Sequence, residues 1–371
     1  MKYVSPSLVR SEQRANADSL FPFHKYGSEV VRQAARLIAE DRSIYAVVSA
    51  YALCTCIALL ATGTASAFAF LAYIPTWPIV FFLLFPFVYA MLGLLQVVHR
   101  IDRRRRLAIM RVLTPERLAS IVAGLVLLAA TMVFQGAFTS LKNAFPIWAD
   151  GFPYDRVQAD IDEWMHLGRA PWLYLHDVAG TGIMRAVIEW NYNQGWFIVC
   201  FATMFWMAVA KEARPIRTRY FVCYVTSWVL IGSVFAGLFL SAGPAFYGYS
   251  TGDFGRFGAL LTFLDGGTGG RHSASNVQMY LWSLHQAGSP GLGSGISAFP
   301  SMHVSLVTLN ALFLFEHSRR LGMAAFVYVA FVLASSVYLA WHYAIDGYFS
   351  IVVTVCIFLV VRSLYSARER V

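Results

Sequence analysis

The chain has 371 residues, of which 58% are hydrophobic and 13% are charged, and its formal net charge is +9. This composition indicates a polytopic membrane protein, because apolar runs long enough to cross a bilayer recur along the chain. All five cysteines lie inside such runs, so neither a disulfide framework nor a zinc site is expected.

Residues 1–43 form a polar, basic segment that we predict to be a cytoplasmic tail. This segment is too long, ahead of the first apolar run, to belong to a cleavable signal peptide. Residues 30–40 fit a short amphipathic helix lying on the membrane surface, and they fit an ordinary solvated tail equally well.

Eight apolar runs follow, and each is predicted to be a transmembrane helix. They cover residues 44–73, 78–98, 118–139, 194–210, 220–241, 302–316, 321–340 and 343–361. The predicted fold is an all-α polytopic membrane helical bundle of about eight transmembrane helices. Its predicted segments are the tail 1–43, a transmembrane hairpin with a basic cytoplasmic loop 44–117, a catalytic transmembrane domain 118–361 and a cytoplasmic tail 362–371.

The basic residues indicate the topology of this bundle. With the N-terminus in the cytoplasm, the cytoplasmic segments hold 23 of the 29 Lys and Arg residues. The positive-inside rule then predicts a plasma-membrane or inner-membrane protein with both termini in the cytoplasm. The run Arg103–Arg106 anchors this topology next to anionic head groups, so no nucleic-acid partner is expected.

Two long loops, 141–193 and 242–300, fall on the non-cytoplasmic side and are predicted to cover the functional site. The first is acidic and aromatic, and we expect it to contain one or two interfacial helices. The second is rich in Gly and Ser without apolar periodicity between Gly248 and Ser297, which favours an ordered lid or a mobile loop.

Two short polar motifs lie at the non-cytoplasmic ends of predicted helices. His303 follows Ser301 in the first turn of one helix, where free backbone N–H groups and the helix dipole favour an anion. His342 and Asp346 are four residues apart, so on a helix they would share one face. Each histidine alone is explained equally well as a polar anchor, but a carboxylate partner inside an apolar span favours phosphoryl chemistry.

The stretch Phe299–His303, together with His342 and Asp346, resembles the second and third motifs of the type-2 phosphatidic acid phosphatase superfamily. The branch that it looks most like is the inositol phosphorylceramide synthase (aureobasidin-resistance) type. The resemblance covers about residues 142–361 and includes Ser241–Pro244. It also includes residues 160–172, which contain Asp162 and His166, although no role for these two residues follows from it.

The resemblance implies a phosphatidic acid phosphatase-like helical core and a reaction through a phospho-histidine. It makes His342 the nucleophile, Asp346 the group that orients its ring, and His303 the acid and then the base. It implies no metal and no cofactor, provided that cations of the protein neutralise the developing charge.

This sequence departs from the superfamily in its cations. The Lys-x6-Arg-Pro motif is absent, and Ser335 and Ser336 stand where the third motif has Ser-Arg. The remaining candidates for phosphate binding are Lys142, Arg271 with His272 beside it, and the backbone at Ser301. A side chain that snorkels to the membrane interface explains Lys142 equally well.

The predicted function is an integral-membrane lipid phosphotransferase that moves a phosphorylated head group onto a lipid alcohol. With water as the acceptor, the same residues make a lipid or prenyl phosphate phosphatase. Membrane lipids are the expected partners in both cases. A transporter with an intramembrane proton relay is a weaker alternative, since no inverted repeat is visible, and a metal-dependent oxidase would need closer histidine clusters.

Overall fold

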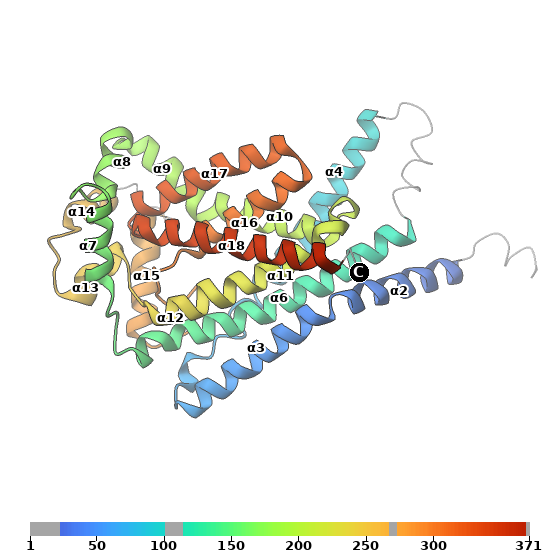
Figure 1. The fold of residues 1–371 in the computed structure, drawn as a ribbon, viewed down its shortest axis with the longest axis horizontal. Coiled ribbons are helices and arrows are strands. Elements are labelled where there is room, and N and C mark those ends of the chain that lie inside the picture. Colours follow the sequence, from blue (N-terminus) through green and yellow to red (C-terminus); the bar gives the residue numbers. More distant parts are fainter. Residues whose placement is uncertain (1–22, 101–113, 267–272, 369–371) are drawn as a thin grey trace, which may run out of the picture.

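The computed structural model describes residues 23–100, 114–266 and 273–368, and every regular element in those ranges is a helix. Long helices run side by side along the longest axis of the molecule, while several short helices gather at one end (Figure 1). The prediction of an all-α membrane helical bundle is therefore confirmed.

Six helical segments within the described ranges are long and apolar enough to cross a membrane. They are α3 (Arg42–Ala61), η2 (Ile79–Leu84) with α4 (Phe85–Arg100), α6 (Pro115–Trp148), η4 (Lys211–Ala213) through α12 (Ala236–Leu238), α17 (Arg319–Tyr338) and α18 (Ala344–Arg368). The fourth of these also contains α11 (Arg214–Val229) and η5 (Leu230–Phe235).

The other two predicted spans are helical but short. They are α10 (Trp196–Val209) with 14 residues and α16 (Met302–His317) with 16 residues. Both are largely buried, because α16 packs against α10, α11, α17 and α18. A helix enclosed by other helices does not need the full length of a lipid-facing span.

The first predicted span, 44–73, is wrong at its C-terminal end, because α3 stops at Ala61. Gly63 adopts a φ of +69°, and the hydroxyl of Thr62 donates to the carbonyl oxygen of Ala58, which ends the helix. The chain then folds back onto α6, where the hydroxyls of Tyr73 and Thr139 are 2.6 Å apart.

The loop 141–193 holds three helices rather than one or two. They are α7 (Asp155–Met165), α8 (Pro171–Ala179) and α9 (Gly182–Trp190), and a π-helical turn, η3 (Asn191–Gly195), joins α9 to α10.

Between Gly248 and Ser297, where an ordered lid or a mobile loop is predicted, the described residues form regular structure. The segment is mostly helical and contains α13 (Tyr247–Thr251), α14 (Gly258–Asp265) and α15 (Ala274–Gln286), after η6 (Pro244–Phe246). Aromatic stacking holds it in place instead of an apolar stripe: the ring of Trp282 stacks on Phe246 at 5.4 Å and on Tyr249 at 4.6 Å.

The N-terminal helix α2 (Phe23–Glu40) is longer than the predicted 30–40. Its buried Ala34 and Leu37 pack against the first turns of α6, so this part of the chain is not a simple solvated tail. Asp41 follows α2 and forms a buried ion pair of 2.5 Å with Arg217 of α11. The N-terminal helices are thereby attached to the rest of the bundle.

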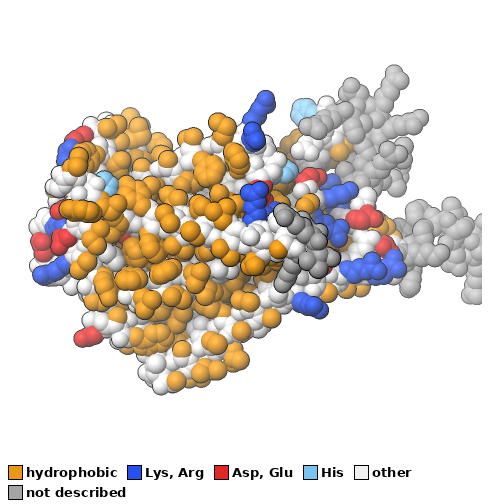
Figure 2. All heavy atoms as spheres, in the orientation of Figure 1, with side chains coloured by type: hydrophobic (Ala, Val, Ile, Leu, Met, Phe, Trp, Pro, Cys, Tyr) orange, Lys and Arg blue, Asp and Glu red, His pale blue; other side chains and the backbone are white. Residues whose placement is uncertain are grey.

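The surface of the bundle agrees with a membrane setting. Hydrophobic side chains cover the flank seen in Figure 2, whereas charged side chains gather toward the two ends. Large apolar residues on this body are exposed, among them Leu53, Leu83, Val327 and Val352. An apolar surface of this extent is expected where lipid is the solvent. The chain is an integral membrane protein by these criteria.

A close contact between α6 and α10 suggests a direct test of the packing. A Cβ atom at Gly124 of α6 would lie 2.6 Å from the carbonyl oxygen of Ala208, whereas one at Gly93 of α4 would meet nothing closer than 3.8 Å. We expect Gly124→Ala to reduce stability by about 1–3 kcal/mol, and Gly93→Ala to leave it unchanged or raise it by up to about 1 kcal/mol. Thermal unfolding in detergent measures both variants, and equal melting temperatures would contradict this packing.

Candidate active site

The first histidine lies where its motif predicts. Helix α16 begins at Met302, and the hydroxyl of Ser301 caps it by accepting a hydrogen bond from the Val304 N–H at 3.4 Å. His303 is the second residue of this helix, so it sits beside the N-terminal backbone groups. The N–H of Ser301 donates to the Asp346 carbonyl oxygen at 3.2 Å, which joins the two motifs directly.

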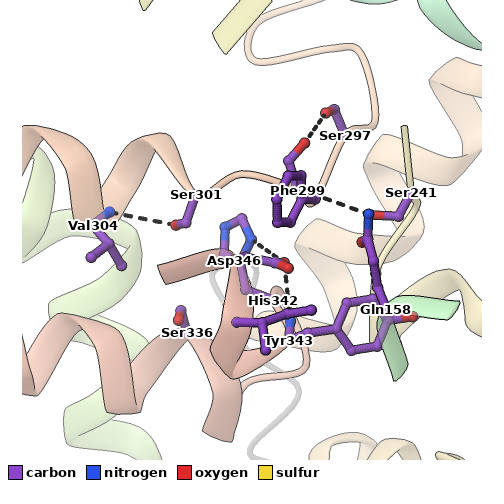
Figure 3. Close-up of polar contacts among 12 residues, drawn as sticks. Gln158, Ser241, Ser297, Phe299, Ser301, Val304, Ser336, His342, Tyr343 and Asp346 are labelled. Carbon is purple, nitrogen blue, oxygen red and sulfur yellow. Dashed lines mark hydrogen bonds and ion pairs between the residues drawn. The ribbon is translucent and has the colours of Figure 1, made fainter. Parts of the chain in front are cut away.

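The second histidine lies between the two predicted spans 321–340 and 343–361 and not on a helix, so it shares no helical face with Asp346. His342 lies in the turn between α17 and α18, and Asp346 reaches back to it from the first turn of α18. The Oδ2 atom of Asp346 is 3.2 Å from Nδ1 of His342 and accepts the Tyr343 N–H at 3.1 Å (Figure 3). The expected pairing is therefore present, although it is made by a turn.

The two imidazole rings lie close to each other. Their centroids are 6.3 Å apart and their planes are inclined by 60°. Since reacting atoms approach within roughly 3–3.5 Å before a group transfer, a phosphoryl group between the rings can contact both. Burial lowers the pKa of His342, and the neighbouring His303 and Lys142 lower it further, so this imidazole is neutral at pH 7.

Lys142 of α6 lies against the loop that precedes His303. Its Cγ atom lies against Gly295, where an added Cβ would be only 3.0 Å away, just before the motif that carries His303. Its ammonium group forms no hydrogen bond and no ion pair with any residue in the described ranges. An ammonium that is partly buried without a counter-ion is costly, so its position favours an anionic ligand.

The other polar groups considered for phosphate binding are either outside the described residues or hydrogen-bonded within the protein. Arg271 and His272 lie outside the described residues. Both polar groups of Ser301 are engaged inside the protein, as described above. The hydroxyls of Ser335 and Ser336 donate at 2.7 Å to carbonyl oxygens of their own helix. Among the described residues, no three His, Cys, Asp or Glu side chains are grouped so that they could hold a metal ion.

Two buried carboxylates of α7 hold the segments around the site. Asp155 accepts the N–H groups of Ala242 and Gly243 and the hydroxyl of Tyr343, each at 2.9 Å. Asp162 accepts the N–H groups of Ala344 and Ile345 at 3.1 and 3.0 Å, and so caps α18. Burial raises the pKa of both carboxyl groups, and the backbone donors oppose that shift.

Sequence reasoning missed the role of Asp155 and found none for Asp162. Their spacing of seven residues, with the small buried Ala159 between them, is the pattern that could have revealed a common buried helix face. His166, which shares the family resemblance, lies farther out, where its Nε2 is 3.0 Å from the Tyr348 hydroxyl. It connects the end of α7 to α18.

Aromatic rings enclose His303. Tyr192 of η3 stacks on it with centroids 4.7 Å apart, and Trp196 of α10 lies at 4.1 Å. The indole N–H of Trp196 donates to the His303 carbonyl oxygen at 3.1 Å. These contacts hold His303 in place.

A sequence model described as the PAP2 superfamily matches residues 158–360. The match spans more than half of the chain and includes His303, His342, Asp346 and Asp162, while Lys142 and Asp155 precede it. No curated protein and no solved structure matches the chain.

The capping role of Asp162 can be tested through stability. Asp162→Asn keeps the shape of the side chain but replaces one acceptor oxygen by an NH2 group, which then faces a backbone N–H. We expect stability to fall by about 1–3 kcal/mol. Asp177→Asn is the matched control, because Asp177 is exposed and, among the described residues, pairs only with Arg169, and such a pair contributes less than about 1 kcal/mol. If thermal unfolding in detergent gives the same melting temperature for both variants, Asp162 does not stabilise the start of α18.

Proposed function

The chain belongs to the PAP2 superfamily, and on that premise we propose that it is an integral-membrane lipid phosphotransferase or phosphatase acting through a phospho-histidine. The observation that carries this proposal is the pair of histidines with ring centroids 6.3 Å apart, one of them bonded to Asp346. Lys142 supports it, since its side chain packs against Gly295 just before the motif that carries His303, and its ammonium has no partner among the described residues.

In the proposed first step, Nε2 of His342 attacks the phosphorus atom while its Nδ1–H donates to Asp346. The new N–P bond forms as the bond between phosphorus and the leaving oxygen breaks. His303 gives its proton to that oxygen, so the leaving group departs as a neutral alcohol. Lys142 stabilises the negative charge that develops on the phosphoryl oxygens.

In the second step the acceptor hydroxyl gives its proton to His303 and attacks phosphorus. The N–P bond breaks, and His342 returns to its neutral form. If the acceptor is a lipid alcohol, the protein is a transferase, which we favour because the motifs resemble those of the inositol phosphorylceramide synthase branch. If the acceptor is water, the same residues make a phosphatase.

We also propose that the site opens to the non-cytoplasmic side. The short helices α7 and α13 to α15 lie at the end of the bundle opposite α2 and the C-terminus (Figure 1). His342 and the start of α16 lie at that same end, next to α7. The concentration of Lys and Arg in the segments at the other end supports a cytoplasmic location for both termini.

Purified protein assayed against phospholipids and prenyl phosphates, with and without ceramide or diacylglycerol, tests the function and separates transferase from phosphatase.

With p-nitrophenyl phosphate as donor, His342→Ala should abolish turnover and any acid-labile label on the protein. Asp346→Asn should be slower by about two to four orders of magnitude.

His303→Ala should behave differently, because the nucleophile remains and p-nitrophenol needs little protonation to leave. We expect the label to form in this variant and to be released slowly. A label mapped to His303 in the wild-type protein would reverse the two roles, and turnover without any label would indicate direct transfer.

The role of Lys142 has its own test. Lys142→Met keeps much of the stem and removes the charge, so we expect kcat/KM to fall by about 100-fold or more, with stability unchanged or increased because an unpaired ammonium is gone. Lys211→Met, an exposed position in η4, is the matched control and should have wild-type activity. Wild-type turnover in Lys142→Met would remove this residue from the site.

A further inference from the structure

Two aromatic side chains beside the histidines each carry a hydrogen-bond donor that has no partner among the described residues. They are the hydroxyl of Tyr192 and the indole N–H of Trp341, both of which are buried atoms. The whole Tyr192 side chain is only 3% exposed. A buried donor without an acceptor costs about 1–3 kcal/mol, and such groups call for a specific explanation such as a ligand that completes them.

The local backbone presents Tyr192 to the site. It belongs to η3, the π-helical turn between α9 and α10, and π-helical turns within helices occur frequently at functional sites. The hydroxyl of Tyr328 on α17 donates to the side-chain oxygen of Asn191 at 3.2 Å, which fixes this turn against the bundle. The position of the phenol ring is therefore determined on both sides.

The ring of Tyr192 lies between the two motifs. It is nearly parallel to His303, with centroids 4.7 Å apart, and to Trp341, with centroids 6.4 Å apart. The phenol ring therefore lies beside His303 and beside the residue next to His342, and its hydroxyl has no partner among the described residues.

We propose that Tyr192 is a substrate-binding residue whose hydroxyl, with the Trp341 indole N–H, donates hydrogen bonds to the phosphoryl oxygens of a lipid phosphate ester, a role that rests on the function proposed above. An indole N–H is a donor only, and phosphoryl oxygens are acceptors. Ser336 stands where the superfamily motif has an arginine, and its hydroxyl donates a hydrogen bond to a carbonyl oxygen of its own helix. In this chain, the uncharged donors of Tyr192 and Trp341 therefore act together with Lys142 in binding the phosphoryl group.

The variant Tyr192→Phe isolates this role, because it keeps the stacked ring and removes only an oxygen that has no partner. If the hydroxyl were merely structural, its removal would leave activity unchanged. We expect instead that kcat/KM for p-nitrophenyl phosphate falls by about 10- to 100-fold, the effect of losing a hydrogen bond to a charged group. Inhibition by orthovanadate, a phosphate analogue, should weaken by a similar factor while the melting temperature stays the same or rises.

Tyr220→Phe is the matched control. Tyr220 is buried in α11, and its hydroxyl donates to the side-chain oxygen of Asn310 at 2.8 Å, away from the histidines. This variant should lose thermal stability and keep its vanadate affinity. Wild-type vanadate affinity and turnover in Tyr192→Phe, or equal losses in both variants, would overturn the inference alone. A wild-type protein that neither hydrolyses the ester nor binds vanadate would overturn the proposed function, and this inference with it.

Discussion

The site depends on backbone N–H groups that two buried carboxylates satisfy. The start of α18 and the loop before η6 both expose amide donors in the protein interior, and Asp162 and Asp155 accept them from one face of α7. Asp155 also accepts the Tyr343 hydroxyl, so a single side chain joins both segments. Helix α7 therefore helps to position the segments around the two histidines, although it carries neither histidine.

This connection continues toward His303 through Ser241. Its carbonyl oxygen accepts the Ala298 N–H at 2.8 Å, and its hydroxyl accepts the Phe299 N–H at 3.3 Å (Figure 3). A series of buried hydrogen bonds therefore runs from α7 through this loop to the segment just before α16. In a region of low dielectric constant such bonds are strong, and fixed dipoles need no reorganisation during a reaction.

The sequence predicts the architecture and the central residues because these depend on local patterns. Apolar runs predict the bundle, and the motifs around His303 and His342 predict two histidines and an aspartate that the fold does bring together. Contacts between distant segments leave no such pattern. Tyr192 lies more than a hundred residues before His303, and the stacked rings of the second long loop have no periodicity, so only the folded chain shows their roles.

The short helix α16 sets the depth of the reaction centre. Glu316 near its C-terminal end pairs with Arg219 at the charged end of the bundle. From there, the rise of a helix carries the chain only about 20 Å to His303, whereas the hydrocarbon layer is about 30 Å thick. In a bilayer whose one face lies at that charged end, the imidazoles would lie below the opposite head groups. For the lipid substrate proposed above, the phosphate would then move inward while the acyl chains stay among their neighbours.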